Sequence, residues 1–163
     1  MDDLLPKNFS RMENQETLVF QSGSILFAEG EDSHFLYLIK RGKVLLVKEK
    51  NKSLKKVDVL GPQEIIGLNS LVKDCLHENT AFSIGQVEVV KIKKTEIKAV
   101  LSKCSPWVFN LIKTIGERLE KTNKLMIEHN ILEDEKYLNN DSLKLNEADF
   151  FFLLSDYREK MEE

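Results

Sequence analysis

The residues best suited to bind a small molecule lie between positions 60 and 84, in a stretch flanked by strand-like apolar runs. Gly67 ends a short apolar pair, and Asn69 is a favoured N-cap residue for a short helix that continues through Ser70. A helix that begins there would direct free backbone N–H groups at the space above it, which suits an anion such as phosphate. The alternative is a surface turn that contains one helical turn and binds nothing. The candidate pocket residues here are Gly67, Leu68, Asn69 and Ser70, with Lys73 and His77 in the loop that follows.

Residues that would support catalysis or metal binding do not occur in the usual patterns. His34, His77 and His129 form no His-x-His pair on a strand, which a metal-binding cupin would need. Cys75 and His77 are two residues apart in a loop, but no third or fourth ligand stands near them. The sequence also lacks a Gly-x-Ser-x-Gly motif, a phosphate loop and a dinucleotide fingerprint. We therefore predict a non-enzyme with no metal and no cofactor, although its pocket could hold a small effector.

The overall composition limits the fold and the partners. The 163 residues are 42% hydrophobic, enough for one core of ordinary size with a helical extension. The formal net charge is -3, so no basic field would draw the protein to nucleic acid, and we predict no DNA partner. Two cysteines are too few for a disulfide framework, and no apolar run is long enough to span a membrane. Asp2 and Asp3 stand where a signal peptide would be positive, so we expect a cytoplasmic protein without a membrane partner.

Residues 23–104 carry the pattern of an all-β domain. Short runs rich in β-branched and aromatic residues are separated by turns at Gly30, at Arg41 with Gly42, at residues 51–53 and at Gly85. This even spacing predicts about eight short strands in a jelly roll, which is a mainly β fold with flanking helices. The clearest runs are residues 25–28, 35–40, 44–48, 57–60, 80–84 and 87–92.

Helical periodicity is found on both sides of this β domain. Residues 1–22 place apolar residues at roughly helical spacing and predict a short N-terminal helix, and a further short helix is expected from Thr95. A long helix is predicted over residues 105–134, with Ser105 as its N-cap and Pro106 at its first position. At about 1.5 Å per residue it should reach about 40 Å, which is longer than the roll can cover.

The apolar stripe of this long helix predicts a homodimer. A protruding apolar stripe usually pairs with another helix, and here the expected partner is the same helix of a second copy. In the alternative, the protein is a monomer in which the last three turns of the helix fold back on the domain or pack on the tail. The predicted interface residues are Val108, Leu111, Ile112, Ile115, Leu119 and Met126.

Residues 135–163 are predicted to form an acidic tail with a short aromatic helix. After Glu133 the chain contains nine acidic and four basic residues, which cannot make a DNA-recognition module. The helix is expected from Asn146 to Lys160. It could pack on its own domain or on the dimer partner, or it could form a docking surface for another protein. Its apolar residues are Phe150, Phe151, Phe152, Leu153, Leu154 and Tyr157.

The stretch after Leu60 resembles the phosphate-binding cassette of the cyclic-nucleotide-binding domain, the sensor module of the catabolite-activator group and of cyclic-nucleotide-gated proteins. The family cassette reads roughly Gly-x-x-Phe-Gly-Glu-x-Ala-Leu-Leu, followed after a loop by Arg-(Ser/Thr)-Ala. Residues 23–30 and 35–42 also match the family through their spaced glycines, so the resemblance covers roughly residues 16–125. The matching cassette residues are Gly61, Ile66, Gly67, Leu68, Ser70, Leu71, Val72, Asn79, Thr80 and Ala81.

The resemblance implies a sensor domain whose ligand affinity has changed. In the family the cassette glutamate holds the ribose hydroxyl and the arginine holds the cyclic phosphate, whereas this chain has Leu68 and Asn79 at those positions. Thr122 and Asn123 match a Thr-Ser pair that meets the adenine in catabolite activators, although a polar pair on a dimer helix can also set its register. We therefore expect a stand-alone, non-catalytic regulatory or sensor domain that signals through its C-terminal helices, with weak, altered or lost cyclic nucleotide affinity. The alternative is a dimeric adaptor or scaffold with a vestigial pocket.

Overall fold

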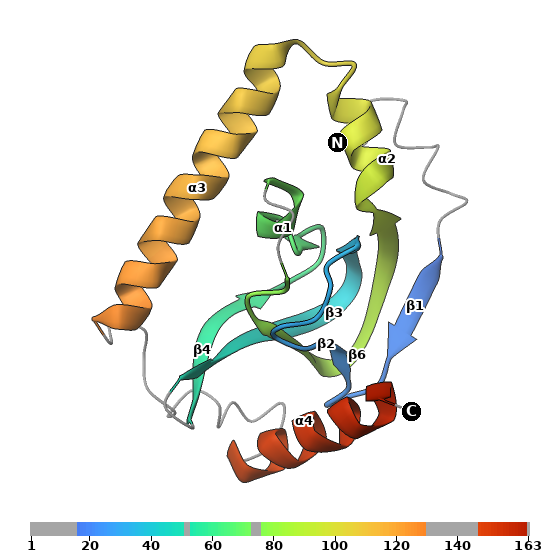
Figure 1. The fold of residues 1–163 in the computed structure, drawn as a ribbon. Helices are drawn as coiled ribbons and strands as arrows, with labels where there is room; N and C mark the ends of the chain where they lie inside the picture. The colour runs from blue at the N-terminus through green and yellow to red at the C-terminus, as the bar shows by residue number, and fades with distance from the viewer. Residues whose placement is uncertain (1–15, 51–52, 73–75, 130–146, 163) are drawn as a thin grey trace.

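The architecture is a β-roll with helices around it, and the computed structural model describes residues 16–50, 53–72, 76–129 and 147–162 of the chain. Within these residues, six strands form one antiparallel sheet that curls into a roll, and four helices flank it (Figure 1). The prediction of a mainly β jelly roll with flanking helices is confirmed.

Two long strands, β3 (Phe35–Lys50) and β6 (Thr80–Lys93), form the centre of the sheet. They pair antiparallel from Phe35 opposite Lys93 to Val47 opposite Thr80. Every other strand of the described chain attaches to one of these two. The shorter strands are β1 (Thr17–Phe20) and β2 (Ile25–Phe27), which pair with β6, and β4 (Ser53–Leu60) and β5 (Ile65–Ile66), which pair with β3.

Arg41 and Gly42 form a bulge inside β3 and not the predicted turn between two short strands. The register with β6 shifts on both sides of Arg41, and Gly42 has a φ of +86°. A Cβ atom at Gly42 would collide with the carbonyl oxygen of Gln86, so glycine lets the two strands approach closely. Gly85 likewise lies inside β6. Six strands, two of them long, therefore replace the roughly eight short strands expected for the described residues.

The end of the predicted N-terminal helical segment, residues 1–22, is a strand and not a helix. Thr17–Phe20 form β1, which pairs with residues 87–90 of β6. The apolar and aromatic side chains of this run suit a strand, and pairing with β6 satisfies its backbone hydrogen-bonding groups. The residues that suggested a helix, Leu4, Leu5, Phe9 and Met12, lie outside the described part of the chain.

The core consists of two clusters of buried side chains, and both draw on the central strands. Leu45 of β3 belongs to a cluster around Phe82, whereas its neighbour Val44 belongs to a second cluster around Tyr37. Successive strand side chains point to opposite faces of a sheet, so one strand can supply both clusters. The second cluster matters most for the site described below, because Phe27 and Ile66 belong to it.

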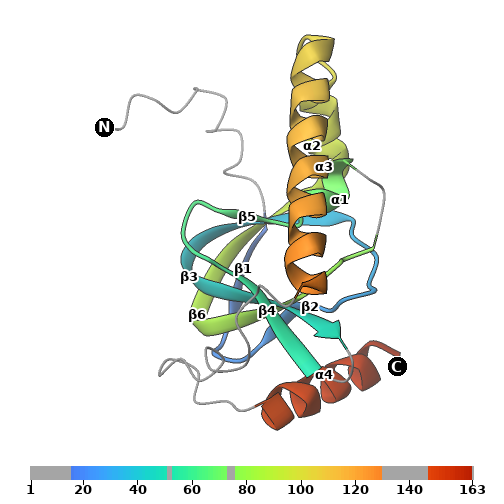
Figure 2. The same cartoon turned by 90° about the vertical axis from the view of Figure 1, so that its left-hand side faces the viewer.

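The helices after the roll begin where the sequence predicts them. α2 (Lys94–Leu101) follows β6 directly, and α3 (Pro106–Glu128) starts at the predicted proline, with the Val108 amide donating to the Ser105 carbonyl oxygen at 2.9 Å. α3 runs along the side of the roll and packs on the short helix α1 (Asn69–Val72) (Figures 1 and 2). Residues 130–134, the end of the predicted long helix, lie outside the described part. Among the helices of the described residues, none is long and apolar enough to cross a membrane.

The apolar stripe of α3 is largely exposed in the single chain. Ile115 is 58% exposed and Leu119 is 53% exposed, although both are large apolar residues. Val108, Ile112 and Met126, also predicted for the dimer interface, are partly buried. The other exposed large apolar residues of α3 are Trp107, Phe109, Leu111 and Leu125.

The C-terminal helix α4 (Glu147–Glu162) covers one end of the roll (Figures 1 and 2). Phe150 and Leu154 are buried, and the Phe150 ring meets Phe82 edge to face with the ring centroids 4.7 Å apart. A carboxylate oxygen of Glu147 accepts a hydrogen bond from the Leu54 amide at 2.7 Å. The aromatic tail helix therefore packs on its own domain, which was the first of the three alternatives.

Because Phe150 completes the core cluster around Phe82, its truncation should destabilise the whole roll. We expect Phe150→Ala to lower the free energy of unfolding by about 3 to 5 kcal/mol, measured by urea denaturation. Phe152 is the matched control, since it is 72% exposed on the same helix. Phe152→Ala should change stability by less than about 0.5 kcal/mol. Equal effects of the two substitutions would show that α4 does not pack as described.

Candidate functional site

The candidate cassette is a tight connection between β5 and α1. Gly67 has a φ of +90°, and the Ser70 hydroxyl donates back to its carbonyl oxygen at 2.6 Å. The Ser33 hydroxyl donates in turn to the Ser70 oxygen at 2.7 Å, and both serines are buried. These bonds fix the loop without any ligand.

The start of α1 differs from the predicted N-cap. Asn69 is the first residue of the helix and does not precede it. The Ser70 amide donates to the Gly67 carbonyl oxygen at 3.1 Å, and the Leu71 amide donates to the Leu68 carbonyl oxygen at 3.0 Å. Two of the N–H groups that were expected to face an anion are therefore already bonded, because this one-turn helix tightens at its start.

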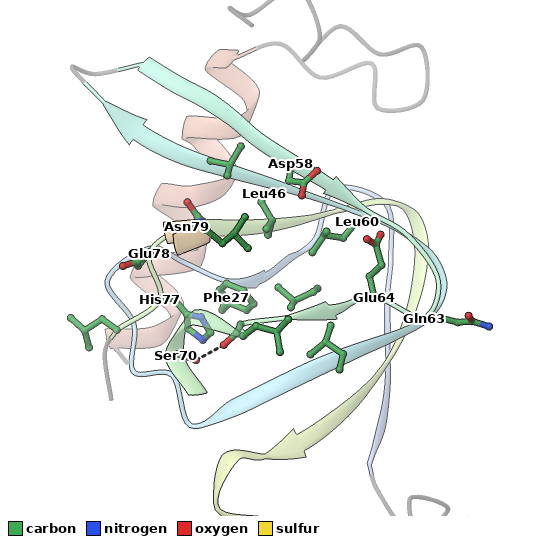
Figure 3. A pocket seen from close by; sticks show the side chains of 17 residues that line it. Phe27, Leu46, Asp58, Leu60, Gln63, Glu64, Ser70, His77, Glu78 and Asn79 are labelled. Atoms are coloured by element: carbon green, nitrogen blue, oxygen red, sulfur yellow. Dashed lines mark hydrogen bonds between the residues drawn. The ribbon is translucent and has the colours of Figure 1, made fainter. Parts of the chain in front are cut away.

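A cavity of about 510 Å³ lies between the cassette, β4 and the middle of α3. Leu119 enters its wall from α3, whereas Phe27 and Ile66 come from the core of the roll. Most of the wall is apolar, as is usual for small-molecule sites of this size. The remaining lining residues are Leu46, Val57, Asp58, Leu60, Gln63, Glu64, Ile65, Gly67, Leu68, Ser70, Leu76, His77, Glu78 and Asn79 (Figure 3).

Five of the predicted pocket residues line this cavity: Gly67, Leu68, Ser70, His77 and Asn79. Thr80 and Ala81 do not, because both are buried in β6, where the Thr80 hydroxyl oxygen accepts a hydrogen bond from the Glu29 amide at 3.0 Å. Lys73 and the side chain of Asn69 lie outside the described part of the structure.

Of the two predicted base contacts on α3, Thr122 is described and is not part of the cavity wall. Thr122 is exposed, and its hydroxyl donates to the Arg118 carbonyl oxygen of the same helix at 3.0 Å. Thr122 does not line the cavity, and the side chain of Asn123 is outside the described part. Leu119, predicted only for the dimer interface, is the residue of α3 that reaches the cavity among the side chains that the structure describes.

The apolar wall of the cavity was not predicted from the sequence. Phe27, Leu46 and Leu60 lie on three different strands, and the sequence identifies them only as strand residues. Their alternation predicts burial, but it does not say which buried residues border a cavity and which fill the core. The registers of β2 with β6, of β6 with β3, and of β3 with β4 and β5 bring these side chains together with the cassette.

His77 is the most unusual polar residue of the cavity. Its side chain is 6% exposed, and the imidazole stacks on Phe27 with the ring centroids 3.7 Å apart. The backbone is held by two hydrogen bonds, from the His77 amide to the Glu31 carbonyl oxygen and from the Gly30 amide to the His77 carbonyl oxygen. Burial, together with the positive charge of Lys94, lowers the pKa of His77 to about 4. The imidazole is therefore neutral at pH 7.

The charged side chains around the cavity are acidic. Asp58, Glu64 and Glu78 stand around the His77 and Phe27 rings in Figure 3. The lining residues of the described chain include no lysine and no arginine. Among the described lining residues, an anionic phosphate would meet carboxylates and no cationic side chain.

Comparison with known proteins assigns the roll to a protein family. The family model of the cyclic nucleotide-binding domain matches residues 17–104. The lysophospholipase NTE1 of Pyricularia oryzae is 26% identical over 125 residues, which cover 74% of this chain and 8% of that protein. This chain therefore spans only a small part of that relative.

Two solved structures share the fold at low sequence identity. The cAMP-bound form of the EAL enzyme Bd1971 has a TM-score of 0.63 and 22% identity, covering 71% of this chain and 31% of that one. The catabolite activator protein of Thermus thermophilus has a TM-score of 0.61 and 18% identity, covering 80% of this chain and 61% of that one.

The low pKa of His77 predicts a specific loss of stability in acid. The pKa is about 4 in the folded protein against an ordinary value of 6.5, so the unfolded chain takes up the proton first as the pH falls. The stabilisation from a neutral His77 is thus complete above about pH 6.5 and is lost progressively towards pH 4. We expect wild type to lose roughly 1 to 2 kcal/mol more than His77→Phe between pH 7 and pH 5, measured by urea unfolding.

The control for this pH experiment is His129→Gln, because His129 is exposed just after α3. This variant should lose stability between pH 7 and pH 5 as the wild type does. If His77→Phe followed the same pH profile as the wild type, the imidazole would not be buried in its neutral form.

Proposed function

We propose, for a chain that belongs to the cyclic nucleotide-binding domain family, a regulatory function without catalysis. The family match and the regulator-like neighbours support a regulatory or sensor role. In this proposal the domain binds a small effector weakly or in an altered way and signals through its C-terminal helices. We also propose a cytoplasmic location, which suits the free, exposed thiol of Cys104.

The observation that carries the proposal is the position of Leu119. This residue of α3 lines the same cavity as Gly67 and Ser70 of the cassette, yet it is 53% exposed as part of the apolar stripe. An occupant of the cavity would therefore touch the helix on which an assembly partner would pack. A sensor needs such an element, because a ligand shifts an equilibrium only through contacts that differ between two states.

The proposal includes weak binding of cyclic nucleotides. Leu68 and Asn79 stand at the two positions where the family resemblance implies a glutamate for the ribose and an arginine for the phosphate. Leu68 and Asn79 both line the cavity, so the two motif positions lie beside the site although their residue types differ from those of the family. The surrounding carboxylates of Asp58, Glu64 and Glu78 add repulsion for a phosphate.

We further propose that α3 forms a homodimer with the same helix of a second copy. Ile112, Ile115, Leu119, Thr122 and Met126 follow a repeat of three and four residues, which is the spacing of a coiled-coil seam. The exposure of Ile115 and Leu119 in the single chain supports this arrangement. The proposed partners include no DNA and no membrane.

The second candidate function is a dimeric adaptor or scaffold with a vestigial pocket. The internal hydrogen bonds of Gly67, Ser70 and Ser33 favour it, because they hold the cassette in place without a ligand. The two functions differ in whether the cavity binds a small molecule at all.

The cyclic nucleotide prediction can be tested by restoring the two anchors. We expect no low-micromolar binding of cyclic AMP or cyclic GMP to the wild type in calorimetric titration. Leu68→Glu with Asn79→Arg should tighten binding, because two hydrogen bonds to charged groups contribute about 3 to 6 kcal/mol. That is a gain of about a hundredfold to ten-thousandfold.

The control is the exchanged pair, Leu68→Arg with Asn79→Glu, which adds the same charges at the wrong positions and should gain no affinity. Low-micromolar binding by the wild type, or an equal gain in both double variants, would contradict the proposal.

The dimer can be tested by sedimentation at tens of micromolar protein. We expect the wild type to be a dimer, and Ile115→Lys with Leu119→Lys to be a monomer, since two charges would be buried in the seam. Asn110→Lys is the control, because it adds a charge on the other side of α3. Circular dichroism should show that each variant remains folded. A monomeric wild type, or a dimer that survives the double substitution, would contradict this assembly.

A further inference from the structure

The cavity combines an apolar wall with an apolar mouth. Phe27, Leu46 and Leu60 border its interior. Leu68 and Leu76 also line it, yet they remain 49% and 50% exposed. Exposed leucines at the edge of a cavity are typical of a site where an apolar ligand would cover them.

The carboxylates of the lining decide which charge such a ligand can carry. Glu64 is held in place by the Gly61 amide, which donates to its carboxylate at 2.5 Å, and Asp58 accepts from the Val59 amide at 2.8 Å. The described lining residues include no lysine and no arginine. A ligand with a negative charge would therefore be repelled, whereas a neutral or positive one would not.

His77 supplies an independent observation that points to a ligand. The imidazole lines the cavity and is 6% exposed, and no residue of the described chain forms a hydrogen bond with either ring nitrogen. A neutral imidazole has one donor and one acceptor nitrogen. Leaving them unpaired in a buried site costs free energy, and a ligand group placed against the ring would recover it.

We propose that the cavity binds an apolar ligand that carries one hydrogen-bonding group and no negative charge. The apolar body contacts Phe27, Leu46 and Leu60, and the polar group bonds to the ring of His77. This inference rests on the proposed sensor function and names the chemical class of its effector. The proposed ligand class excludes the phosphate compounds that the cassette would otherwise suggest.

A pair of fluorescent probes with one aromatic body tests the proposal. N-phenyl-1-naphthylamine is uncharged and carries one N–H group, and 8-anilino-1-naphthalenesulfonate adds a negative charge to the same body. We expect the uncharged probe to bind one site per chain and at least about tenfold more tightly than the sulfonate. Equal or tighter binding of the sulfonate, or no binding of the uncharged probe, would overturn the proposal.

Variants locate the probe in the cavity. Leu46→Trp and Leu60→Trp each fill the space from a different strand, and at least one folded variant should abolish binding of the uncharged probe. Asp58→Asn with Glu64→Gln should increase the affinity for the sulfonate about tenfold, so that it approaches the affinity for the uncharged probe. Phe152→Ser is the control, since this exposed residue lies on α4 and does not line the cavity. Unchanged binding in both folded tryptophan variants would place the probe elsewhere and overturn the proposal.

His77→Phe tests the polar contact, because it keeps an aromatic ring at this position and removes both ring nitrogens. Loss of one hydrogen bond should weaken the uncharged probe about threefold to tenfold. No change would overturn the role of His77.

The same titrations separate this inference from the proposed function. Displacement of the probe by low-micromolar cyclic AMP would contradict weak nucleotide binding. The protein could also be a dimer that binds neither cyclic nucleotides nor the uncharged probe. This result would contradict the proposed ligand class alone, and it would support the adaptor function.

Discussion

The antiparallel pairing of β3 with β6 is the interaction on which the rest of the structure depends. Each remaining strand of the described chain pairs with one of these two, so none of them has a place in the sheet without the central ladder. The bulge at Gly42 lets the pair bend without breaking. The ladder thereby brings the cassette residues before β6 close to β4 and β5, and it delivers the chain into α2 and α3. The cavity is a consequence of this pairing and not of any local motif.

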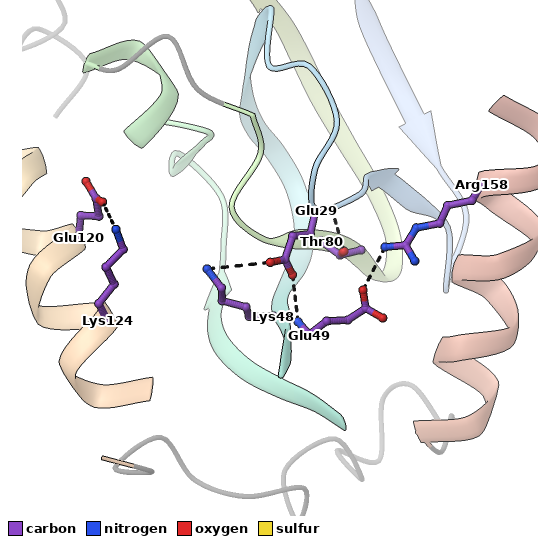
Figure 4. Close-up of polar contacts among 7 residues, drawn as sticks. All are labelled: Glu29, Lys48, Glu49, Thr80, Glu120, Lys124 and Arg158. Atoms are coloured by element: carbon purple, nitrogen blue, oxygen red, sulfur yellow. Dashed lines mark hydrogen bonds and ion pairs between the residues drawn. The ribbon is translucent and has the colours of Figure 1, made fainter. Parts of the chain in front are cut away.

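The turn around Glu29 and Glu31 joins the C-terminal helix to the cavity. Tyr157 of α4 donates to the Glu31 carboxylate at 3.3 Å, and the carbonyl oxygen of Glu31 accepts from the His77 amide at 2.8 Å. Figure 4 shows the neighbouring contacts, in which Arg158 pairs with Glu49 at 3.1 Å and the Glu49 amide donates to Glu29 at 3.0 Å. Partly exposed ion pairs contribute little, about 0 to 1 kcal/mol each, so buried Phe150 and Leu154 hold α4 in place. The polar contacts then fix its orientation against the turn that carries His77.

The sequence predicts those parts of this protein whose signal is local. The start of α3 at Pro106 and the helices α2 and α4 follow from capping and periodicity, and they are confirmed. The continuous strands through Gly42 and Gly85 were missed, because a glycine in a turn and a glycine in a bulge have the same sequence signal. β1 was missed because its partner is distant in the chain. For the site, the cassette was predicted from its motif, whereas Phe27, Leu46 and Leu60 meet only through strand register, which no local pattern encodes.

The position of α3 connects the two properties that a sensor must combine. Leu119 borders the cavity, and the next residue, Glu120, is buried and pairs with Lys124 at 2.5 Å (Figure 4). The hydrogen bond and the charge of Glu120 raise the pKa of Lys124, and a pair at this spacing ties successive turns of α3 together. In the proposed sensor, an assembly that fixes Leu119 would change ligand affinity by the same factor by which the ligand changes assembly, because coupling between sites is reciprocal.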